Sequence, residues 1–412
     1  MAAHKYFIGE AIDKPAIHHE SFEKLWETKW KAPCAMGVYP FMFGCLADFE
    51  PVAQSIIAAG LKPPYDWDVY ASHFIPQAHK LLAVADEALS NGEKEKASEY
   101  YLRASAVFRI ARFPAIRSPK QKECWEAGKD AFYKGAALME FPIKEVIIPH
   151  KHAKQGEGDV IPANYLVPPG PGPKPVVLIF TGLDGHRTEL AVWQRGWLDK
   201  GVATVVVEIP GTGDSPADAR DPESPDRQLS SVLDWIAAQG ELDSTKVVVW
   251  GFSTGGYYSL RAGHTHADRL LGVVSQGGGC HHMFDREWLE KVNVLEFPFD
   301  LANALAFKWG YGSLEDFIQE AGKFSLVNDG TLKKKCCNVL LVNGKEDEIF
   351  PIEDLYVALE HGGPKLARAV AGRKHMGEPE AFFVILEWIH GLLGLDGDVA
   401  SQMRGLPSRM KY

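Results

Sequence analysis

The residues VVVWGFSTGG (Val247–Gly256) carry the strongest structural signal in this chain. They contain the pattern G-x-S-x-G, with Ser253 at its centre, between an apolar run typical of a buried strand and a segment typical of a helix. This context predicts a nucleophile elbow, a sharp strand-to-helix turn that exposes a serine hydroxyl and directs the first N–H groups of the helix at a reacting carbonyl. We therefore expect Ser253 to be a catalytic nucleophile.

Short apolar runs alternate with helical segments on both sides of this stretch. The expected strands are Glu145–Pro149, Asn164–Pro168, Val176–Thr181, Ala203–Glu208, Val247–Gly251, Gly272–Gln276, Val339–Asn343 and Ala367–Ala371. Continuous apolar runs such as VVLIF and VVVW are typical of strands that are buried on both faces. The alternation predicts a mostly parallel, doubly wound sheet of eight strands. Together with the elbow, it indicates an α/β-hydrolase fold.

The pattern is different before residue 142. Apolar residues at helical spacing predict helices over Ala78–Leu89, Glu93–Arg112 and Lys120–Met139, with a turn at Asn91–Gly92. The stretch Cys280–Lys335 also departs from strand–helix alternation and is predicted to be a helical insertion after the sixth strand. We thus expect a helical N-terminal cap region over residues 1–141 and a catalytic domain over residues 142–412, with residues 280–335 as a cap insertion.

Composition narrows the classes of function. The net charge of -10 and the lack of a basic stripe argue against nucleic-acid binding. The six cysteines form no C-x-x-C pair and are interpreted as free thiols. No secretory signal and no apolar run of membrane-spanning length is visible, so we expect an intracellular, cytoplasmic protein without a membrane span. A homodimer and an association with endomembrane vesicles are left open.

No cofactor or metal is predicted. The chain has neither a GxxxxGK[ST] phosphate loop nor a GxGxxG motif after a first strand. His281–His282 beside Cys280 lacks a partner motif such as HExxH, so we do not interpret it as a metal site.

A serine nucleophile needs a base and an acid that orients the base, and in this fold the three follow in the order serine, acid, histidine. The run VLLVNGKEDEIFP (Val339–Pro351) reads as a late strand, a glycine turn and three acidic residues. We choose Asp347 as the acid, with Glu346 and Glu348 as the alternatives.

The histidine is expected in the loop after the last strand. His375, in RKHMG, lies there, ahead of the helical run Phe382–Leu393. His361 falls at the end of a helical segment and His390 within the last helix, so both are interpreted as structural. We therefore predict His375 as the base.

An oxyanion hole requires two backbone N–H groups, one after the nucleophile and one from the loop after the third strand. These are Thr254 and Leu183, the latter in TGLDGHR (Thr181–Arg187). Asp184 and His186 either hold the shape of this loop or contact the substrate. The small-residue turn IPGTGDSP (Ile209–Pro216) is expected to border the site.

A resemblance covers nearly the whole chain. The matching stretches are LWETKWK (25–31), VYPF (38–41), FRIARFP (108–114), TGLDG (181–185), EIPGTGDSPAD (208–218), SPDR (224–227), VVWGFSTGGYYSLRAGHTHADRLLG (248–272), KFSLV (323–327), PIEDL (351–355) and HMG (375–377). In these stretches the chain resembles the fungal yellowish-green pigment hydrolases of dihydroxynaphthalene-melanin biosynthesis. More distantly, it is similar to helical-cap C–C hydrolases such as the dihydropseudooxynicotine hydrolases.

The resemblance implies a polyketide-shortening activity. Members of the family remove an acetoacetyl unit from a heptaketide naphthopyrone and leave tetrahydroxynaphthalene, a melanin precursor. Candidate substrate contacts are Asp184, Tyr257, Arg109, Arg112 and His281. The two arginines lie among aromatic residues of one expected helix and its end, and the alternative is that the aromatic residues belong to the core while the arginines are solvated or salt-bridged. A carboxylesterase or thioesterase would use the same nucleophile, acid and base. An inactive binding protein is the rival of another class, and the intact serine, acid and histidine argue against it.

Overall fold

A computed structural model describes residues 5–403 of the chain. These residues divide into two compact units, one of helices over residues 15–145 and one that contains the sheet over residues 5–14 and 146–403. The predicted boundary at 141/142 differs from this division mainly at the N-terminus. Tyr6 packs edge-on against Trp288 with ring centroids 4.9 Å apart, and Lys5 pairs with Asp285, so this segment packs with the sheet-containing unit.

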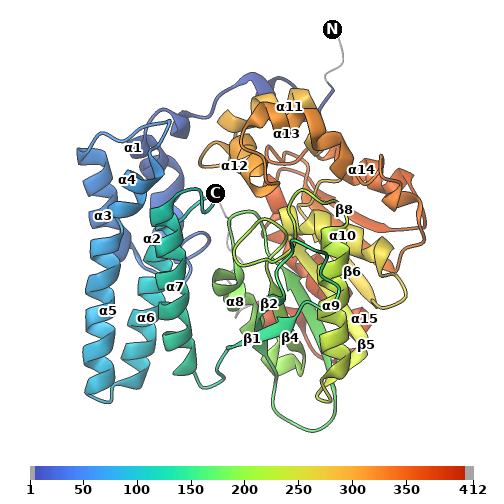
Figure 1. Ribbon diagram of the computed structural model, residues 1–412, viewed down its shortest axis with the longest axis horizontal. Helices are drawn as coiled ribbons and strands as arrows, with labels where there is room; N and C mark the ends of the chain where they lie inside the picture. Colours follow the sequence, from blue (N-terminus) through green and yellow to red (C-terminus); the bar gives the residue numbers. More distant parts are fainter. Residues whose placement is uncertain (1–4, 404–412) are drawn as a thin grey trace. The chain divides into compact units, whose positions relative to one another are not determined.

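The helical unit is built around three long helices, α5 (Ile75–Ser90), α6 (Lys94–Ala111) and α7 (Pro119–Ala137) (Figure 1). Before them come α1 (Phe22–Leu25), α2 (Lys31–Met36), α3 (Leu46–Ala58) and α4 (Trp67–Ser72). The predicted turn between α5 and α6 is present, with Gly92 at φ +79°. Glycines on α7 let α6 approach closely, because a Cβ on Gly135 would lie 2.9 Å from Leu102 Cγ.

The sheet has the strand order β1-β2-β4-β3-β5-β6-β7-β8. The strands are β1 (Lys144–Pro149), β2 (Val160–Leu166), β3 (Lys174–Phe180), β4 (Ala203–Val207), β5 (Leu242–Phe252), β6 (Gly272–Gln276), β7 (Asn338–Gly344) and β8 (Leu366–Val370). All pairs from β4 to β8 are parallel, and β2 runs antiparallel to β4. The prediction of an eight-stranded, mostly parallel sheet of the α/β-hydrolase type is confirmed.

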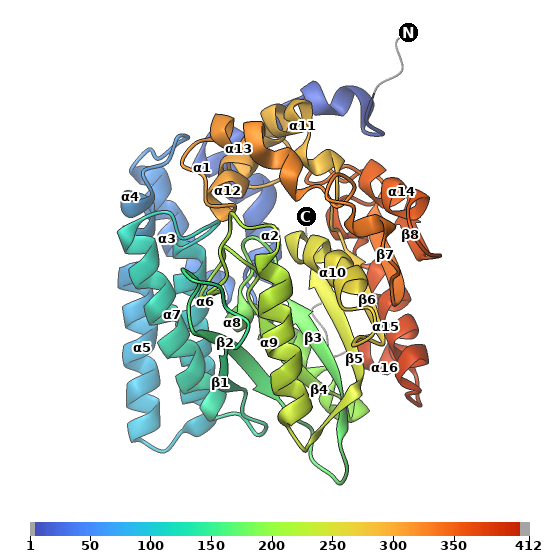
Figure 2. The ribbon, with the colours of Figure 1, turned by 45° about the vertical axis from the view of Figure 1, so that its right-hand side comes forward.

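Helices cover both faces of the sheet. Helices α9 (Ser224–Ala238) and α10 (Thr254–Thr265) lie on one face (Figure 2). On the other, α8 (Arg187–Arg195) and α15 (Glu380–Leu393) enclose an aromatic core in which Trp193 lies 4.7 Å from Phe382 and 6.0 Å from Trp250, between ring centroids. Burial of such large side chains is the main source of stability in the unit.

The expected insertion between β6 and β7 is helical. It contains α11 (Arg286–Lys291), α12 (Leu301–Lys308) and α13 (Leu314–Glu320), and Trp309 stacks on Phe317 within it at 5.5 Å between ring centroids. After β7 come α14 (Glu353–Glu360) and, beyond α15, α16 (Val399–Met403). Within residues 5–403, no helix combines the length and the apolar character needed to cross a membrane.

Candidate active site

Ser253 occupies a strained turn between β5 and α10. Its backbone has φ 55° and ψ -121°, a conformation that residues other than glycine rarely adopt. The neighbouring glycines leave no space for a side chain, because a Cβ on Gly255 would lie 2.3 Å from the Thr181 carbonyl oxygen and one on Gly251 would lie 2.1 Å from that of Gly255. The G-x-S-x-G pattern therefore corresponds to a tight elbow that leaves the Ser253 side chain partly exposed.

Ser253, His375 and Asp347 form one hydrogen-bonded chain. His375 Nε2 lies 2.8 Å from Ser253 Oγ, and His375 Nδ1 lies 2.8 Å from Asp347 Oδ2. Both His375 and Asp347 are buried. With Nδ1 protonated towards the carboxylate, Nε2 is free to accept the serine proton. The structure thus brings together the three residues that the sequence singled out as nucleophile, base and acid.

The Asp347 carboxylate is held by three further donors. Asn343 Nδ2 donates to Oδ2 at 2.6 Å, and the N–H groups of Ile349 and Phe350 donate to Oδ1 at 2.7 and 3.0 Å. The alternatives for the acid lie elsewhere: Glu346 is exposed, and Glu348 is hydrogen-bonded to Lys374. Of the three acidic residues, Asp347 is the one that contacts the His375 ring.

The loop that carries His375 is fixed through its neighbour Met376. Met376 has φ 74°, its N–H donates to Asn343 Oδ1 at 3.0 Å, and its carbonyl accepts a hydrogen bond from Gln276 Nε2 at 3.3 Å. Asn343 therefore binds both the acid and the histidine loop. Sequence reasoning did not identify Asn343, although its place at the end of the strand before the acid was a usable signal.

A second buried acid, Glu296, lies beside His375 and Asp347. It comes from the insertion, and its Oε1 accepts the backbone N–H of His375 at 3.2 Å, while Oε2 lies 3.8 Å from Lys374 Nζ. Burial and the negative charge of Asp347 raise the pKa of Glu296 to about 7, against the opposing influence of His375 and Lys374. The sequence predicted no role for Glu296, since no motif or spacing marks it.

Glu296, Asp347 and His375 offer potential metal-ligand atoms within 4.8 Å of one another. Both ring nitrogens of His375 already have hydrogen-bond partners, Asp347 at Nδ1 and Ser253 at Nε2, and the Asp347 carboxylate accepts three more hydrogen bonds. Asp347 thus orients the His375 ring towards Ser253, and this arrangement fits proton transfer better than metal ligation.

The two expected oxyanion donors lie next to the elbow. Thr254 is the first residue of α10, where backbone N–H groups have no partner within the helix. The loop with Leu183 lies against the elbow, because a Cβ on Gly182 would lie 3.2 Å from the Phe252 carbonyl oxygen. Leu183, Asp184 and His186 are all buried, and the His186 N–H donates to Glu189 Oε2 at 2.5 Å as α8 begins.

Two of the expected substrate contacts, Tyr257 and His281, belong to the sheet-containing unit and differ in how far they are buried. Tyr257 is buried, and its hydroxyl donates to the Phe324 carbonyl at 2.7 Å, so this group is engaged within the chain. His281 is half-buried, and its Nδ1 lies 2.7 Å from Ser325 Oγ.

Arg109 and Arg112 belong to α6 and its C-terminal end in the helical unit. Both are buried, and their guanidinium groups lie over aromatic rings, Arg109 at 4.7 Å from the Tyr39 ring centre and Arg112 at 5.2 Å from that of Trp125. Each guanidinium therefore packs on an aromatic side chain of its own unit, where cation–π attraction contributes to the packing.

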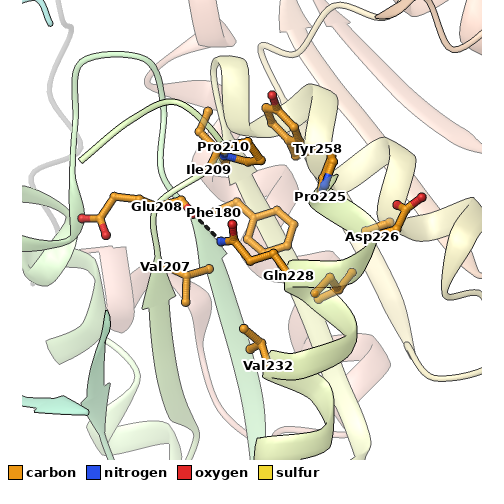
Figure 3. A pocket seen from close by; sticks show the side chains of 12 residues that line it. Phe180, Val207, Glu208, Ile209, Pro210, Pro225, Asp226, Gln228, Val232 and Tyr258 are labelled. Carbon is orange, nitrogen blue, oxygen red and sulfur yellow. Dashed lines mark hydrogen bonds between the residues drawn. The ribbon is translucent and has the colours of Figure 1, made fainter. Parts of the chain in front are cut away.

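A small cavity of about 20 Å³ lies at the carboxyl ends of β3 and β4 (Figure 3). It has room for about one water molecule. Its lining includes Phe180, Ile209, Pro210 and Tyr258, and does not include Ser253. The turn at 209–216 therefore starts on the wall of this cavity.

Comparisons with known proteins relate this chain to hydrolases. A family model described as FrsA-like esterase matches residues 77–389. A protein named hydrolase LUC6 from a Fusarium species is 29% identical in an alignment of 313 positions that covers 66% of this chain and 73% of the relative. The 2,6-dihydropseudooxynicotine hydrolase of Paenarthrobacter nicotinovorans is 24% identical in an alignment of 337 positions that covers 78% of this chain and 84% of the relative.

The crystal structure of a 2,6-dihydroxy-pseudo-oxynicotine hydrolase superimposes with a TM-score of 0.67 at 20% identity, over 89% of this chain and 95% of that one. At this level of identity the likeness concerns the fold.

Proposed function

Because this chain belongs to the FrsA-like esterase family, we propose that it is a serine hydrolase. From its resemblance to the pigment hydrolases, we further propose that it cleaves a carbon–carbon bond in an aromatic polyketide. The coarser statement, that the chain is a hydrolase with an α/β-hydrolase fold, follows from the family, the relatives and the sheet. The observation that carries the proposal is the hydrogen-bonded chain from Ser253 through His375 to Asp347.

The first half of the reaction forms an acyl-enzyme. His375 Nε2 takes the Ser253 hydroxyl proton as Oγ attacks a ketone carbonyl attached to the aromatic ring. Asp347 stabilises the imidazolium that results. The N–H groups of Leu183 and Thr254 bind the oxyanion of the tetrahedral intermediate.

Collapse of this intermediate breaks the bond between the carbonyl carbon and the ring. The electron pair passes to the ring carbon, where the adjacent phenol oxygens delocalise the charge, and His375 returns its proton to that carbon. The acyl group stays on Ser253 as an ester. In the second half, His375 takes a proton from water, hydroxide attacks the ester, and a carboxylic acid leaves as Ser253 regains its proton.

The substrate class is inferred from the resemblance. We propose a heptaketide naphthopyrone that loses a short acyl unit such as acetoacetate and yields tetrahydroxynaphthalene for melanin formation. The similarity to a 2,6-dihydropseudooxynicotine hydrolase supports a hydrolase that acts on a small organic substrate. A flat polyphenol also suits a serine hydrolase chemically, because a ring with phenol groups stabilises the leaving carbon.

A carboxylesterase or thioesterase is the second candidate, favoured by the description of the family as esterases. It would use the same three residues, because only the leaving group differs. An alcohol or thiol leaving group needs no ring to stabilise it.

The deciding experiment follows the products by mass spectrometry after incubation with a naphthopyrone polyketide. We expect tetrahydroxynaphthalene and acetoacetate in equal amounts with the wild type and neither with Ser253→Ala. Labelling by a fluorophosphonate, expected in the wild type and absent in Ser253→Ala, tests the nucleophile independently of the substrate. If labelling occurs and esters are hydrolysed while the polyketide is untouched, the esterase alternative is correct.

A further inference from the structure

A buried ion network that the proposed reaction does not use lies at the end of β4. Glu208 follows this strand, and its side chain is about 1% exposed. Its Oε1 accepts the backbone N–H of Arg187 at 3.0 Å, and its Oε2 accepts a hydrogen bond from Arg187 Nη1 at 2.9 Å. The same Nη1 donates to Asp214 Oδ2 at 2.8 Å. One carboxylate therefore binds both the main chain and the side chain of Arg187.

Such a network is poorly explained by stability alone. Burial raises the pKa of Glu208, and the positive charge of Arg187 acts against this rise. Taking two charges out of water costs free energy that their attraction only roughly offsets, so a buried ion pair is weak support for a fold. A buried pair does fix geometry, because each partner has to meet the other in one arrangement.

Glu208 fixes one end of the oxyanion loop, defined here as residues 181–186 between β3 and α8. At the other end, the Thr181 N–H donates to the Val207 carbonyl at 3.2 Å. Thr181 at the start of the loop and Arg187 directly after its end are thus hydrogen-bonded to two consecutive residues, Val207 and Glu208, at the tip of β4. Leu183 lies in the middle of the loop, so the position of its N–H depends on both attachments.

The neighbouring turn is shaped around the same side chain. Gly213 has φ +51°, and a Cβ there would lie 2.5 Å from Glu208 Cγ, so the turn at 209–216 folds directly over this residue. Figure 3 shows the Glu208 side chain pointing away from the small cavity, while its backbone carbonyl accepts a hydrogen bond from Gln228 Nε2 at 2.7 Å. The Glu208 carboxylate is thereby directed at Arg187 and not at the cavity.

We propose that Glu208 is a positioning residue that holds the oxyanion loop, through Arg187, where the Leu183 N–H meets the developing oxyanion. This inference rests on the proposed function, in which Leu183 supplies one of the two oxyanion donors. Glu208 itself does not contact substrate. Its loss should raise the barrier of the step in which negative charge forms on the carbonyl oxygen, and leave substrate binding largely unaltered.

The test compares Glu208→Gln with the wild type on 4-nitrophenyl acetate and on the matching thionoester. Sulfur accepts hydrogen bonds weakly, so a thionoester gains little from an oxyanion hole. Gln keeps the size of Glu208, but its amide group presents N–H donors to the donors of Arg187. We expect kcat on the oxygen ester to fall about 10- to 100-fold, part of the loss seen when an oxyanion donor is removed. KM and the thionoester rate should change less than about 3-fold.

Glu157→Gln is the matched control. The Glu157 side chain is also buried and binds an arginine and the main chain, with Arg227 Nη2 at 2.8 Å and the Lys154 N–H at 2.8 Å. Its other main-chain donor is the Asp218 N–H at 3.2 Å, which lies outside the oxyanion loop. Glu157→Gln should lower the unfolding temperature without a selective loss on the oxygen ester. Glu208→Asp, which keeps the charge and shortens the reach, serves as a second variant and should show the same selectivity.

The outcomes separate the two proposals. Equal losses on both esters in the Glu208 variants, or losses no larger than in Glu157→Gln, overturn the positioning role and leave the serine mechanism standing. Two results overturn the proposed function itself. One is a wild type that hydrolyses the oxygen ester and the thionoester equally well, and the other is a Ser253→Ala variant that stays active. If Glu208→Gln does not fold, the selectivity of Glu208→Asp decides.

Discussion

Asn343 donates its side-chain N–H to Asp347 Oδ2 at 2.6 Å, and this oxygen is the same one that meets His375 Nδ1. Asn343 Oδ1 in turn accepts the N–H of Met376, the residue after His375. One amide side chain therefore sets the distance between the acid and the loop that carries the base. The Met376 N–H and the Asp347 carboxylate would each lose a buried partner without it.

We expect Asn343→Ala to lower kcat by about 10- to 100-fold through misplacement of the His375 ring, and to lower stability by about 2–4 kcal/mol because buried hydrogen-bonding groups lose their partner. Steady-state kinetics and thermal unfolding measure the two effects. Asn338→Ala, at the exposed start of the same strand, is the control and should keep nearly full activity. Near-normal turnover of Asn343→Ala would mean that other bonds suffice to hold the loop.

The choice of acid leads to a second prediction. Asp347→Asn should lower kcat by about 10³- to 10⁴-fold, because an amide opposite Nδ1 no longer stabilises the imidazolium and favours the wrong tautomer. Glu346→Gln and Glu348→Gln should stay close to the wild type, since the first side chain is exposed and the second pairs with Lys374. A larger loss for Glu348→Gln than for Asp347→Asn would transfer the role of the acid to Glu348.

The role of Arg109 can be tested with two substrates. The guanidinium lies between aromatic rings, 4.7 Å from the Tyr39 ring centre and 5.3 Å from that of Phe113, and the side chain is buried. We expect Arg109→Ala to destabilise the helical unit by about 2–4 kcal/mol through lost packing and cation–π contact.

Circular dichroism during heating measures that loss of stability. The packing role also predicts similar losses of activity on a bulky polyketide and on 4-nitrophenyl acetate. A loss confined to the polyketide would instead indicate that Arg109 contacts the substrate.

Much of the sheet could be predicted because its strands are continuous apolar runs between turn residues. The strand Gly272–Gln276 was predicted with the bounds that the structure has, and the others differ by a few residues at their ends. The elbow could be recognised for a related reason: the close contacts of Gly251 and Gly255 with neighbouring backbone permit only glycine, so geometry imposes a sequence pattern.

Residues whose role depends on distant parts of the chain could not be predicted in this way. Glu296 reaches the His375 N–H across 79 positions, from an insertion without a regular pattern. Tyr257, a candidate substrate contact, donates its hydroxyl hydrogen to the Phe324 carbonyl 67 positions away. Contacts of this kind depend on tertiary packing, which local spacing does not encode.

Glu296 gives the protein a pH-dependent stability whose sign can be worked out. Its pKa is about 7 in the folded chain, raised by burial and by Asp347, against an ordinary value of 4.5. Between these two values the folded chain binds more protons than the unfolded chain, so stability falls as the pH rises from about 4.5 to about 7. The contribution is fully present below the ordinary pKa and is lost once Glu296 ionises in the folded state. At about 1.4 kcal/mol for each pKa unit, the change amounts to roughly 2–4 kcal/mol.

Glu296→Gln should remove this dependence, because the amide does not ionise and its oxygen can still accept the His375 N–H. We expect the variant to unfold at a similar temperature to the wild type at pH 5 and at a higher temperature at pH 8. Both proteins carry Ser253→Ala, so that stability is measured apart from turnover. Thermal unfolding across this pH range provides the measurement. Glu346→Gln, which removes an exposed carboxylate nearby, is the control and should follow the wild type. A constant difference between Glu296→Gln and the wild type from pH 5 to pH 8 would show that Glu296 does not titrate in this window.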